Sequence, residues 1–424
     1  MNATTTDRRS QPGTVGVVGA GTMGSGIAQV ALEAGERVLI HDPDPDALAR
    51  ARERVADGLI RRNRRRIAGS AGSPGGSVDA TLGRLEEVPD LEALAREADV
   101  VIEAALEDLS LKQAIFARLD ALAGPAVILA TNTSALSVAA IAGSAQHRDR
   151  VIGLHFFNPA PLMPLVEVVV PPGAAPAIAD EATTLVRRWG KTPVRAADSP
   201  GFIVNRINRP FTLEALTLLE AGDGTVDTID AAIRADGFPM GPFELMDLVG
   251  IDVNLAAARG IFEGFSYEPR FRPSVIQERL VEAGRLGRKT GEGFYWYGED
   301  GRSLGVAGAF VAEAGPNRDL VAGPRALPSG EPIGAYPSEP AAIVERIVLA
   351  IVNEAYWALG DGVASIADID LALRLGASHP SGPFERTAAL GGPAAVLARL
   401  ESWQSAGPRF APAPSLIAAA RSSS

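Results

Sequence analysis

The sequence predicts an α/β protein in which a doubly wound, mainly parallel sheet domain is followed by an all-α domain and a second, degenerate copy of that helical domain. Three observations predict this fold class. Short apolar runs alternate with helical patterns over residues 1–197, which is typical of a parallel sheet covered by helices. The rest of the chain has helical periodicity, and its last part repeats an earlier part.

The strands expected in the sheet domain are short runs rich in valine, isoleucine and leucine. Helical patterns separate several of these runs, and a stretch dense in glycine and serine at 68–77 predicts a flexible loop. We place the end of the domain at residue 197. The expected strands are 14–18, 37–40, 100–103, 126–130, 151–155 and 165–170.

An internal repeat divides the helical part into two copies. Segments 203–206, 214–215 and 229–230 are matched 140 residues later, and 241–244 is matched by 382–385. Several ordered matches at a nearly constant offset indicate a duplicated domain. The predicted boundaries are 198–297 for the first copy, 298–337 for a linker rich in glycine and proline, and 338–424 for the second copy.

The composition excludes several classes of function. The net charge of −11 argues against binding to nucleic acid or to anionic membranes. The chain has no cysteine, which excludes disulfides, thiolate catalysis and cysteine-ligated metals, and we expect no metal site. Residues 1–13 lack the apolar core of a signal peptide, and the charges within the apolar stretch 341–360 indicate an amphipathic helix. We therefore expect a cytoplasmic protein.

A glycine-rich turn between the first strand and the next helix predicts a dinucleotide site. Glycines allow a tight turn and close backbone approach, and the helix N-terminus attracts a pyrophosphate. Asp42 closes the next strand, where a carboxylate accepts hydrogen bonds from the adenosine ribose. Asp44 and Asp46 would repel a 2′-phosphate, so we expect NAD rather than NADP. The G-x-G-x-x-G motif consists of Gly19, Ala20, Gly21, Thr22, Met23 and Gly24.

His155 is the strongest candidate for a general base among the four histidines. It ends a predicted strand at the carboxyl edge, where parallel sheets bind ligands. Glu167 lies in the apolar run 165–170, where an unpaired carboxylate would be costly. A carboxylate that orients one imidazole nitrogen while the other takes a proton accounts for both residues, an exposed edge-strand glutamate being the alternative. We expect no catalytic role for His41, His147 or His379.

A series of ordered motifs resembles the L-3-hydroxyacyl-CoA dehydrogenase family. The resemblance covers residues 14–297, and the repeat extends it to about residue 400. It implies a Rossmann-type NAD-binding domain and a helical substrate domain. The motifs are 19–24, 132–134, 153–159 with Glu167, 199–206, 240–244 and 289–295.

This resemblance implies roles for four residues at the reacting group. His155 is then the general base, and Glu167 is its orienting partner. Ser134 and Asn205 bind the oxygen atoms of the substrate and align the reacting carbon.

The resemblance also implies contacts to the cofactor and to coenzyme A. Glu107 and Lys112 match residues on the nicotinamide side of the cofactor, an ordinary helix-start pair being the alternative. Asn132 is also expected to contact the cofactor. An acidic protein must attract the phosphates of coenzyme A locally. The arginine run 61–66 lies where the family has basic contacts, and we expect Arg65 to bind coenzyme A, a solvated helix face being the alternative.

The implied reaction is the reversible, NAD-dependent oxidation of the 3-hydroxyl group of a (3S)-3-hydroxyacyl-CoA, as in fatty-acid or aromatic-acid β-oxidation. The 3-hydroxybutyryl and 3-hydroxyadipyl thioesters both fit the sequence. A dehydrogenase of a free hydroxy or sugar acid such as gulonate is one alternative, and the arginine run weighs against it. A non-catalytic NAD-binding protein is the other, and it would need none of Ser134, His155, Glu167 and Asn205.

Three features depart from the shorter family members. The 68–77 loop replaces a segment that is often helical, and Pro164 stands where lysine is common. Glu345 occupies the position in the second copy that matches Asn205, so we expect that copy to be non-catalytic. Short members pair their helical domains in a homodimer. A second copy in one chain would fill that interface, which predicts a monomer with an internal pseudo-dimer, a homodimer being the alternative.

Overall fold

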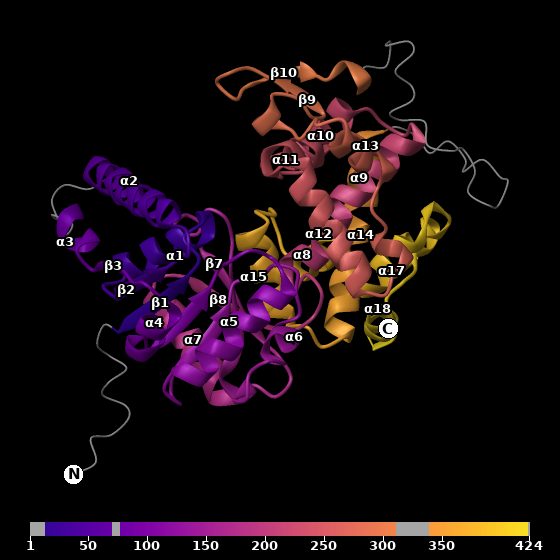
Figure 1. Cartoon of the computed structure of the whole chain (residues 1–424). Helices are drawn as coiled ribbons and strands as arrows, with labels where there is room; N and C mark the ends of the chain where they lie inside the picture. Colours follow the sequence, from indigo (N-terminus) through magenta and orange to yellow (C-terminus); the bar gives the residue numbers. More distant parts are fainter. Residues whose placement is uncertain (1–12, 70–76, 311–338, 423–424) are drawn as a thin grey trace. The chain divides into compact units, whose positions relative to one another are not determined.

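The computed structural model describes residues 13–69, 77–310 and 339–422 and separates into two units, Met1–Ser199 and Pro200–Ser424. Figure 1 labels β1, β2, β3, β7 and β8 of the first unit. These strands belong to an eight-stranded sheet with the order β3-β2-β1-β4-β5-β6-β7-β8. Neighbouring strands are parallel except β6 and β7, which confirms the predicted doubly wound, mainly parallel sheet. The strands are β1 (Thr14–Val18), β2 (Arg37–His41), β3 (Leu85–Glu87), β4 (Val100–Glu103), β5 (Ile128–Thr131), β6 (Val151–Phe156), β7 (Leu165–Val170) and β8 (Thr192–Ala197).

Neither edge strand of this sheet was predicted from the sequence. Strand β3 has only three residues, two of them glutamates, and β8 carries Pro193 and Arg195. Neither strand has the apolar run that identified the other six, because an edge strand is covered on fewer sides. The predicted loop at 68–77 falls mostly outside the described residues.

Helices cover both faces of the sheet. Val15 and Val17 belong to the same buried cluster as Ile27 and Ala28 of α1. A Cβ at Gly16, which faces the other way, would lie 2.4 Å from the side chain of Leu94 in α4. The helices of the first unit are α1 (Thr22–Glu33), α2 (Pro45–Gly69), α3 (Val78–Leu82), α4 (Leu91–Glu97), α5 (Leu109–Leu122), α6 (Val138–Ala142) and α7 (Pro176–Arg188).

The strand order reverses at β1, which pairs with β2 on one side and with β4 on the other. In doubly wound sheets the crossovers on the two sides of such a point run in opposite directions, which separates the loops after the two neighbouring strands, here β1 and β4. The carboxyl ends of β1, β2, β4, β5 and β6 lie along this edge because these strands are parallel. Ligands of doubly wound sheets bind there.

The second unit is mainly helical. A short hairpin of β9 (Tyr295–Tyr297) and β10 (Ser303–Val306) lies between its two halves, so part of the stretch assigned to a linker at 298–337 has regular structure. Within the described ranges, no helix combines the length and the apolar character needed to cross a bilayer. The helices are α8 (Val204–Ile207), α9 (Arg209–Ala221), α10 (Val226–Ala235), α11 (Pro242–Val249), α12 (Ile251–Gly264), α13 (Val275–Glu282), α14 (Pro340–Gly360), α15 (Ile366–Gly376), α16 (Pro383–Ala389), α17 (Pro393–Ser402) and α18 (Pro414–Ser422).

The two halves of the second unit are joined by buried ion pairs. Glu354 of α14 accepts hydrogen bonds from Nε of Arg206 and from Nε of Arg270, each at 2.8 Å. Both arginines belong to the first half. Arg206 has no exposed side-chain surface, and it also contacts Asp361 at 2.6 Å. Burial raises the pKa of Glu354, and the two guanidinium groups oppose that rise.

The same cluster occurs a second time with the halves exchanged. Glu214 of α9 accepts from Nε of Arg346 and from Nε of Arg409, each at 2.6 Å, and both arginines belong to the second half. Glu214 precedes Glu354 by 140 residues, and Arg206 precedes Arg346 by the same number, which is the offset of the repeat. Reciprocal contacts of this kind define a two-fold interface. The halves therefore pack as a pseudo-symmetric pair within one chain.

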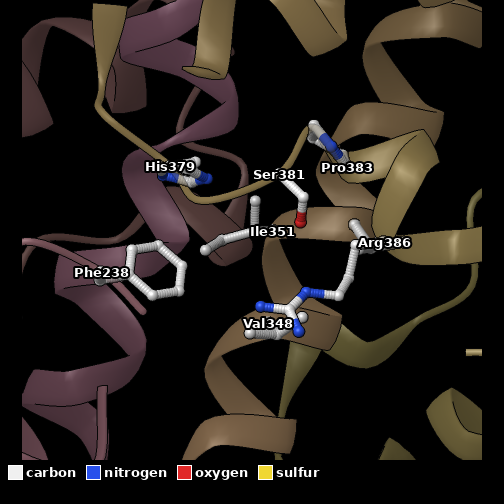
Figure 2. Close-up of a pocket in the computed structure, with 8 residues that line it drawn as sticks. Phe238, Val348, Ile351, His379, Ser381, Pro383 and Arg386 are labelled. Carbon is white, nitrogen blue, oxygen red and sulfur yellow. The ribbon is translucent and has the colours of Figure 1, made fainter. Parts of the chain in front are cut away.

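One position on this interface breaks the symmetry. His379 stands where the first half has Phe238, and the two rings meet edge to face with centroids 4.9 Å apart. Figure 2 shows both side chains at a pocket that Arg386 also lines. Nε2 of His379 lies 2.7 Å from Oδ1 of Asn208, which can only accept, so Nε2 carries a proton. Burial, with a smaller contribution from Arg386, lowers the pKa of His379 from 6.5 to about 3.

We expect His379→Phe to reduce the loss of stability in acid. A histidine whose folded pKa lies below its unfolded value binds a proton on unfolding, so its contribution is complete above pH 6.5 and is lost as the pH falls from 6.5 towards 3. The slope is about 1.4 kcal/mol per pH unit in that window. Urea unfolding from pH 7 to pH 4 measures it, with His147→Gln as the exposed control. An unchanged acid slope in His379→Phe contradicts the assignment.

Candidate active site

The glycine-rich turn after β1 has the geometry of a pyrophosphate cradle. Gly19 has a φ of +101°, and a Cβ there would lie 2.6 Å from the carbonyl oxygen of Ala104. A Cβ at Gly24 would lie 1.8 Å from the carbonyl oxygen of Gly19, so the helix can approach the strand only with glycine. A Cβ at Gly21 would meet nothing within 4 Å. Open space therefore lies at the N-terminus of α1, where a phosphate fits.

Asp42 follows β2 and lies beside this turn. Its Oδ2 accepts a hydrogen bond from the backbone N of Ala20 at 2.8 Å, and its Oδ1 accepts one from the backbone N of Asp44 at 3.0 Å. Arg54 of α2 donates from Nη2 to the carbonyl oxygen of Ala20 at 2.6 Å. The carboxylate is thus fixed next to the space above Gly21, where it can accept hydrogen bonds from a ribose.

We expect Asp42→Ala to raise the dissociation constant for NAD about 10-fold or more, because hydrogen bonds to a charged acceptor are each worth about 1.5–3 kcal/mol. NADP should not gain comparable affinity, since Asp44 still repels a 2′-phosphate. Titration of the protein's fluorescence with each nucleotide measures both constants, and Asp46→Ala serves as the control for the NAD constant. Unchanged NAD affinity in Asp42→Ala contradicts the assignment.

His155 and Glu167 face each other across the antiparallel pair β6 and β7, where they are register partners. Nδ1 of His155 lies 2.6 Å from Oε2 of Glu167. Glu167 has no exposed surface, and β8 pairs with β7, so Glu167 is not an exposed edge-strand residue. A carboxylate accepts the Nδ1 proton, which makes Nε2 the basic nitrogen of the neutral ring. The ring of Phe157 packs beside the imidazole, with centroids 4.6 Å apart.

Asn132 and Ser134 follow β5, the neighbour of β6. Oδ1 of Asn132 accepts a hydrogen bond from the backbone N of Phe156 at 2.8 Å, so this side chain anchors the end of the strand that carries His155. Ser134 is exposed, and its backbone N donates to Oε1 of Glu107 at 3.0 Å. Both residues lie at the carboxyl edge of the sheet.

Glu107 and Lys112 form an ion pair after β4, with Nζ of Lys112 3.3 Å from Oε2 of Glu107. Burial works to raise the pKa of Glu107, but the hydrogen bond from Thr133 and the charge of Lys112 outweigh it and lower this pKa. Lys112 has 1% of its side chain exposed. The pair is therefore more than two solvated residues at a helix start.

The structure of the first unit does not place two other predicted site residues, Asn205 and Arg65, at the carboxyl edge of the sheet. Asn205 lies in α8 of the second unit, so its meeting with His155 and Ser134 stays a prediction. Arg65 lies in α2, but its side chain falls outside what the structure describes. Thr22 and Met23 begin α1, directly after the glycine turn.

A buried carboxylate at the same edge was not among the site residues predicted from the sequence. Glu103 is the last residue of β4 and has no exposed surface. Nζ of Lys112 and the hydroxyl of Thr131 donate to its two oxygens at 2.6 and 2.7 Å. The signal was an acidic residue that ends an apolar strand beside the cofactor turn, which is costly unless it is paired.

His41 and His147 have no place in this constellation. Nδ1 of His41 contacts the carbonyl oxygen of Val88 at 3.1 Å, and His147 lies 3.2 Å from Asp120 with 64% of its side chain exposed. His379 belongs to the helical unit.

Models of known families match almost the whole chain. The NAD-binding domain of 3-hydroxyacyl-CoA dehydrogenase matches residues 14–199. The C-terminal domain of the same enzyme family matches twice, at residues 201–297 and 343–420. The second match agrees with the duplication inferred from the repeat.

Several known proteins are similar to the chain over most of their own length. The 3-hydroxyadipyl-CoA dehydrogenase of Escherichia coli is 40% identical over 89% of this chain and 91% of its own. A 3-hydroxybutyryl-CoA dehydrogenase of Mycobacterium tuberculosis is 43% identical over 67% of this chain and 98% of its own. A crystal structure of 3-hydroxybutyryl-CoA dehydrogenase from E. coli superposes with a TM-score of 0.82 and 37% identity, covering 97% and 98% of the two chains.

Proposed function

The chain belongs to the 3-hydroxyacyl-CoA dehydrogenase family, and we propose that His155, held by Glu167, is the general base with which it oxidises the 3-hydroxyl group of a 3-hydroxyacyl-CoA. NAD is the cofactor. The observation that carries the proposal is the 2.6 Å contact between the imidazole and a fully buried carboxylate at the edge where the glycine turn also lies. A silent nucleotide-binding protein would have no use for this pair.

The chain's own residues supply proton transfer and positioning. Nε2 of His155 accepts the proton of the 3-hydroxyl group, and Glu167 stabilises the imidazolium that forms. Bound NAD supplies the acceptor for the hydride that leaves C3. Ser134 and Asn205 bind the substrate's oxygen atoms and hold C3 in place. In the reverse direction His155 returns the proton to the 3-oxo oxygen of the 3-oxoacyl-CoA.

The proposed cofactor contacts follow the carboxyl edge of the sheet. Asp42 binds the adenosine ribose, and Glu107, Lys112 and Asn132 bind on the nicotinamide side. Arg65 of α2 binds a phosphate of coenzyme A. The pyrophosphate lies on the turn formed by Gly19, Gly21, Thr22, Met23 and Gly24.

An absorbance assay of NADH consumption tests the substrate class. We expect turnover with acetoacetyl-CoA or with 3-oxoadipyl-CoA, since relatives are named for the corresponding butyryl and adipyl substrates. Longer 3-oxoacyl-CoAs give the chain-length preference. The free acids, including a gulonate-type sugar acid in the oxidising direction, are the controls. If the chain turns over a free acid but does not turn over any of the CoA thioesters, the proposal is contradicted.

We propose that the second helical copy replaces a partner subunit, so that the chain is a monomer. The reciprocal clusters around Glu214 and Glu354 support this, because they are the contacts that a two-fold dimer would make between chains. Light scattering at micromolar concentration tests it. A dimer joined through residues 198–297 of both chains would contradict it.

We assign residues 1–197 to NAD binding, 198–297 to substrate binding and 338–424 to a non-catalytic copy. Glu345 supports the last assignment, because it pairs with Arg399 at 2.8 Å on the position that matches Asn205. A cytoplasmic location is part of the same proposal, and cell fractionation tests it.

A further inference from the structure

Glu103 collects three hydrogen bonds inside the sheet domain. Its Oε1 accepts from the backbone N of Ala105 at 2.7 Å and from Nζ of Lys112 at 2.6 Å. Its Oε2 accepts from the hydroxyl of Thr131 at 2.7 Å. These donors come from the loop after β4, from α5 and from the end of β5. The proton transfer described above uses none of these contacts, and Glu103 itself is too deeply buried to touch a ligand.

Lys112 is shared between two carboxylates. Its ammonium group lies 2.6 Å from Glu103 and 3.3 Å from Glu107, and only 1% of its side chain is exposed. A buried ammonium group needs a compensating charge, and the closer and fully buried carboxylate supplies it. Glu103 therefore fixes the position of the ammonium group of Lys112.

Glu107 connects this pair to the loop that carries Ser134. While its Oε2 faces Lys112, its Oε1 accepts from the hydroxyl of Thr133 at 2.6 Å, from the backbone N of Ser134 at 3.0 Å and from that of Ala135 at 3.2 Å. One oxygen is thus held by the lysine, and the other holds the backbone of the serine loop.

We propose that Glu103 is a positioning residue that acts through Lys112 and Glu107 to fix Ser134 at the reacting group. The inference rests on the proposed role of Ser134 in substrate binding. Without the charge of Glu103, the buried ammonium group turns fully towards Glu107. Glu107 then follows the lysine and releases the backbone of the loop.

Glu103→Gln tests this relay because it removes the charge and keeps the shape. We expect kcat to fall about 10- to 100-fold, the range that a small misplacement of a reacting group costs. The dissociation constant for ADP-ribose, which lacks the nicotinamide, should change by less than about threefold, since the glycine turn and Asp42 do not contact Glu103. This split between kcat and affinity for the adenosine half of the cofactor distinguishes misplacement from general loss of structure.

Glu36→Gln is a matched control for the loss of a buried carboxylate. Glu36 also has no exposed surface, and it accepts from Nη2 of Arg188 at 2.6 Å and from Nε1 of Trp189 at 2.9 Å. It directly precedes β2, at the amino edge of the same sheet, away from the cofactor turn. This variant should lose thermal stability and keep its kcat at temperatures where it is folded.

A double-mutant cycle tests whether Glu103 acts through Glu107. We expect the variant with both Glu103→Gln and Glu107→Gln to have the same kcat as Glu107→Gln alone, because the relay is already broken. Multiplicative losses would overturn the proposal, as would an unchanged kcat in Glu103→Gln. Failure of the unaltered chain to turn over any 3-oxoacyl-CoA is a separate outcome, because it contradicts the proposed function itself.

Discussion

We expect His155→Gln to lower kcat about 10²- to 10⁴-fold, the usual contribution of a general acid or base. Glutamine can still hydrogen-bond to Glu167, so the local fold should persist. It cannot accept the hydroxyl proton at neutral pH, because an amide is not basic. The glycine turn and Asp42 lie on other strands, so the dissociation constant for NAD should stay within about twofold.

Stopped-flow or steady-state absorbance of NADH gives kcat, and fluorescence titration gives the NAD constant. His147→Gln is the control, since His147 is exposed and contacts only groups away from the cofactor edge. Equal turnover in His155→Gln and the unaltered chain would falsify the assignment of the base.

The second large effect is expected at the interface between the helical copies. Glu354→Gln removes one carboxylate and leaves two buried guanidinium groups, those of Arg206 and Arg270, without their shared partner. Breaking a buried pair on one side typically costs about 3–5 kcal/mol. Because Arg206 keeps its contact with Asp361, we expect a loss near the lower end, about 3 kcal/mol.

Glu345→Gln is the matched control on the same helix. Glu345 pairs with Arg399, and the two side chains are 33% and 45% exposed, so its loss should cost less than about 1 kcal/mol. Urea unfolding of both variants, followed by circular dichroism of the helical unit, measures the difference. If the two variants are equally stable, the buried clusters do not hold the copies together.

Local signals in the sequence were sufficient to predict the contact between His155 and Glu167 and most of the sheet. The pairing of His155 with Glu167 was predicted because Glu167 is a charged residue inside an apolar run, where it needs a partner. The two residues are register partners in the strand pair. Strand β8 left no such trace, because Pro193 and Arg195 interrupt it. Glu103 was also passed over, since its partners come from other elements.

The duplication was visible in the sequence, whereas the contacts between the copies were not. The repeat aligned Arg206 with Arg346 and Glu214 with Glu354. It could not show that each arginine pairs with the glutamate of the other copy, because pairing across an interface depends on how two surfaces meet and leaves no periodic pattern. The burial of His379 against Asn208 was hidden for the same reason.

A crystal structure of the chain with NAD and acetoacetyl-CoA bound is the most direct test of His155 as the general base. We predict that Nε2 of His155 lies about 2.6–3.2 Å from the 3-oxygen of the substrate, while Nδ1 still faces Glu167. A 3-oxygen outside hydrogen-bonding distance of the imidazole, or a ring turned away from the carboxylate, would contradict it.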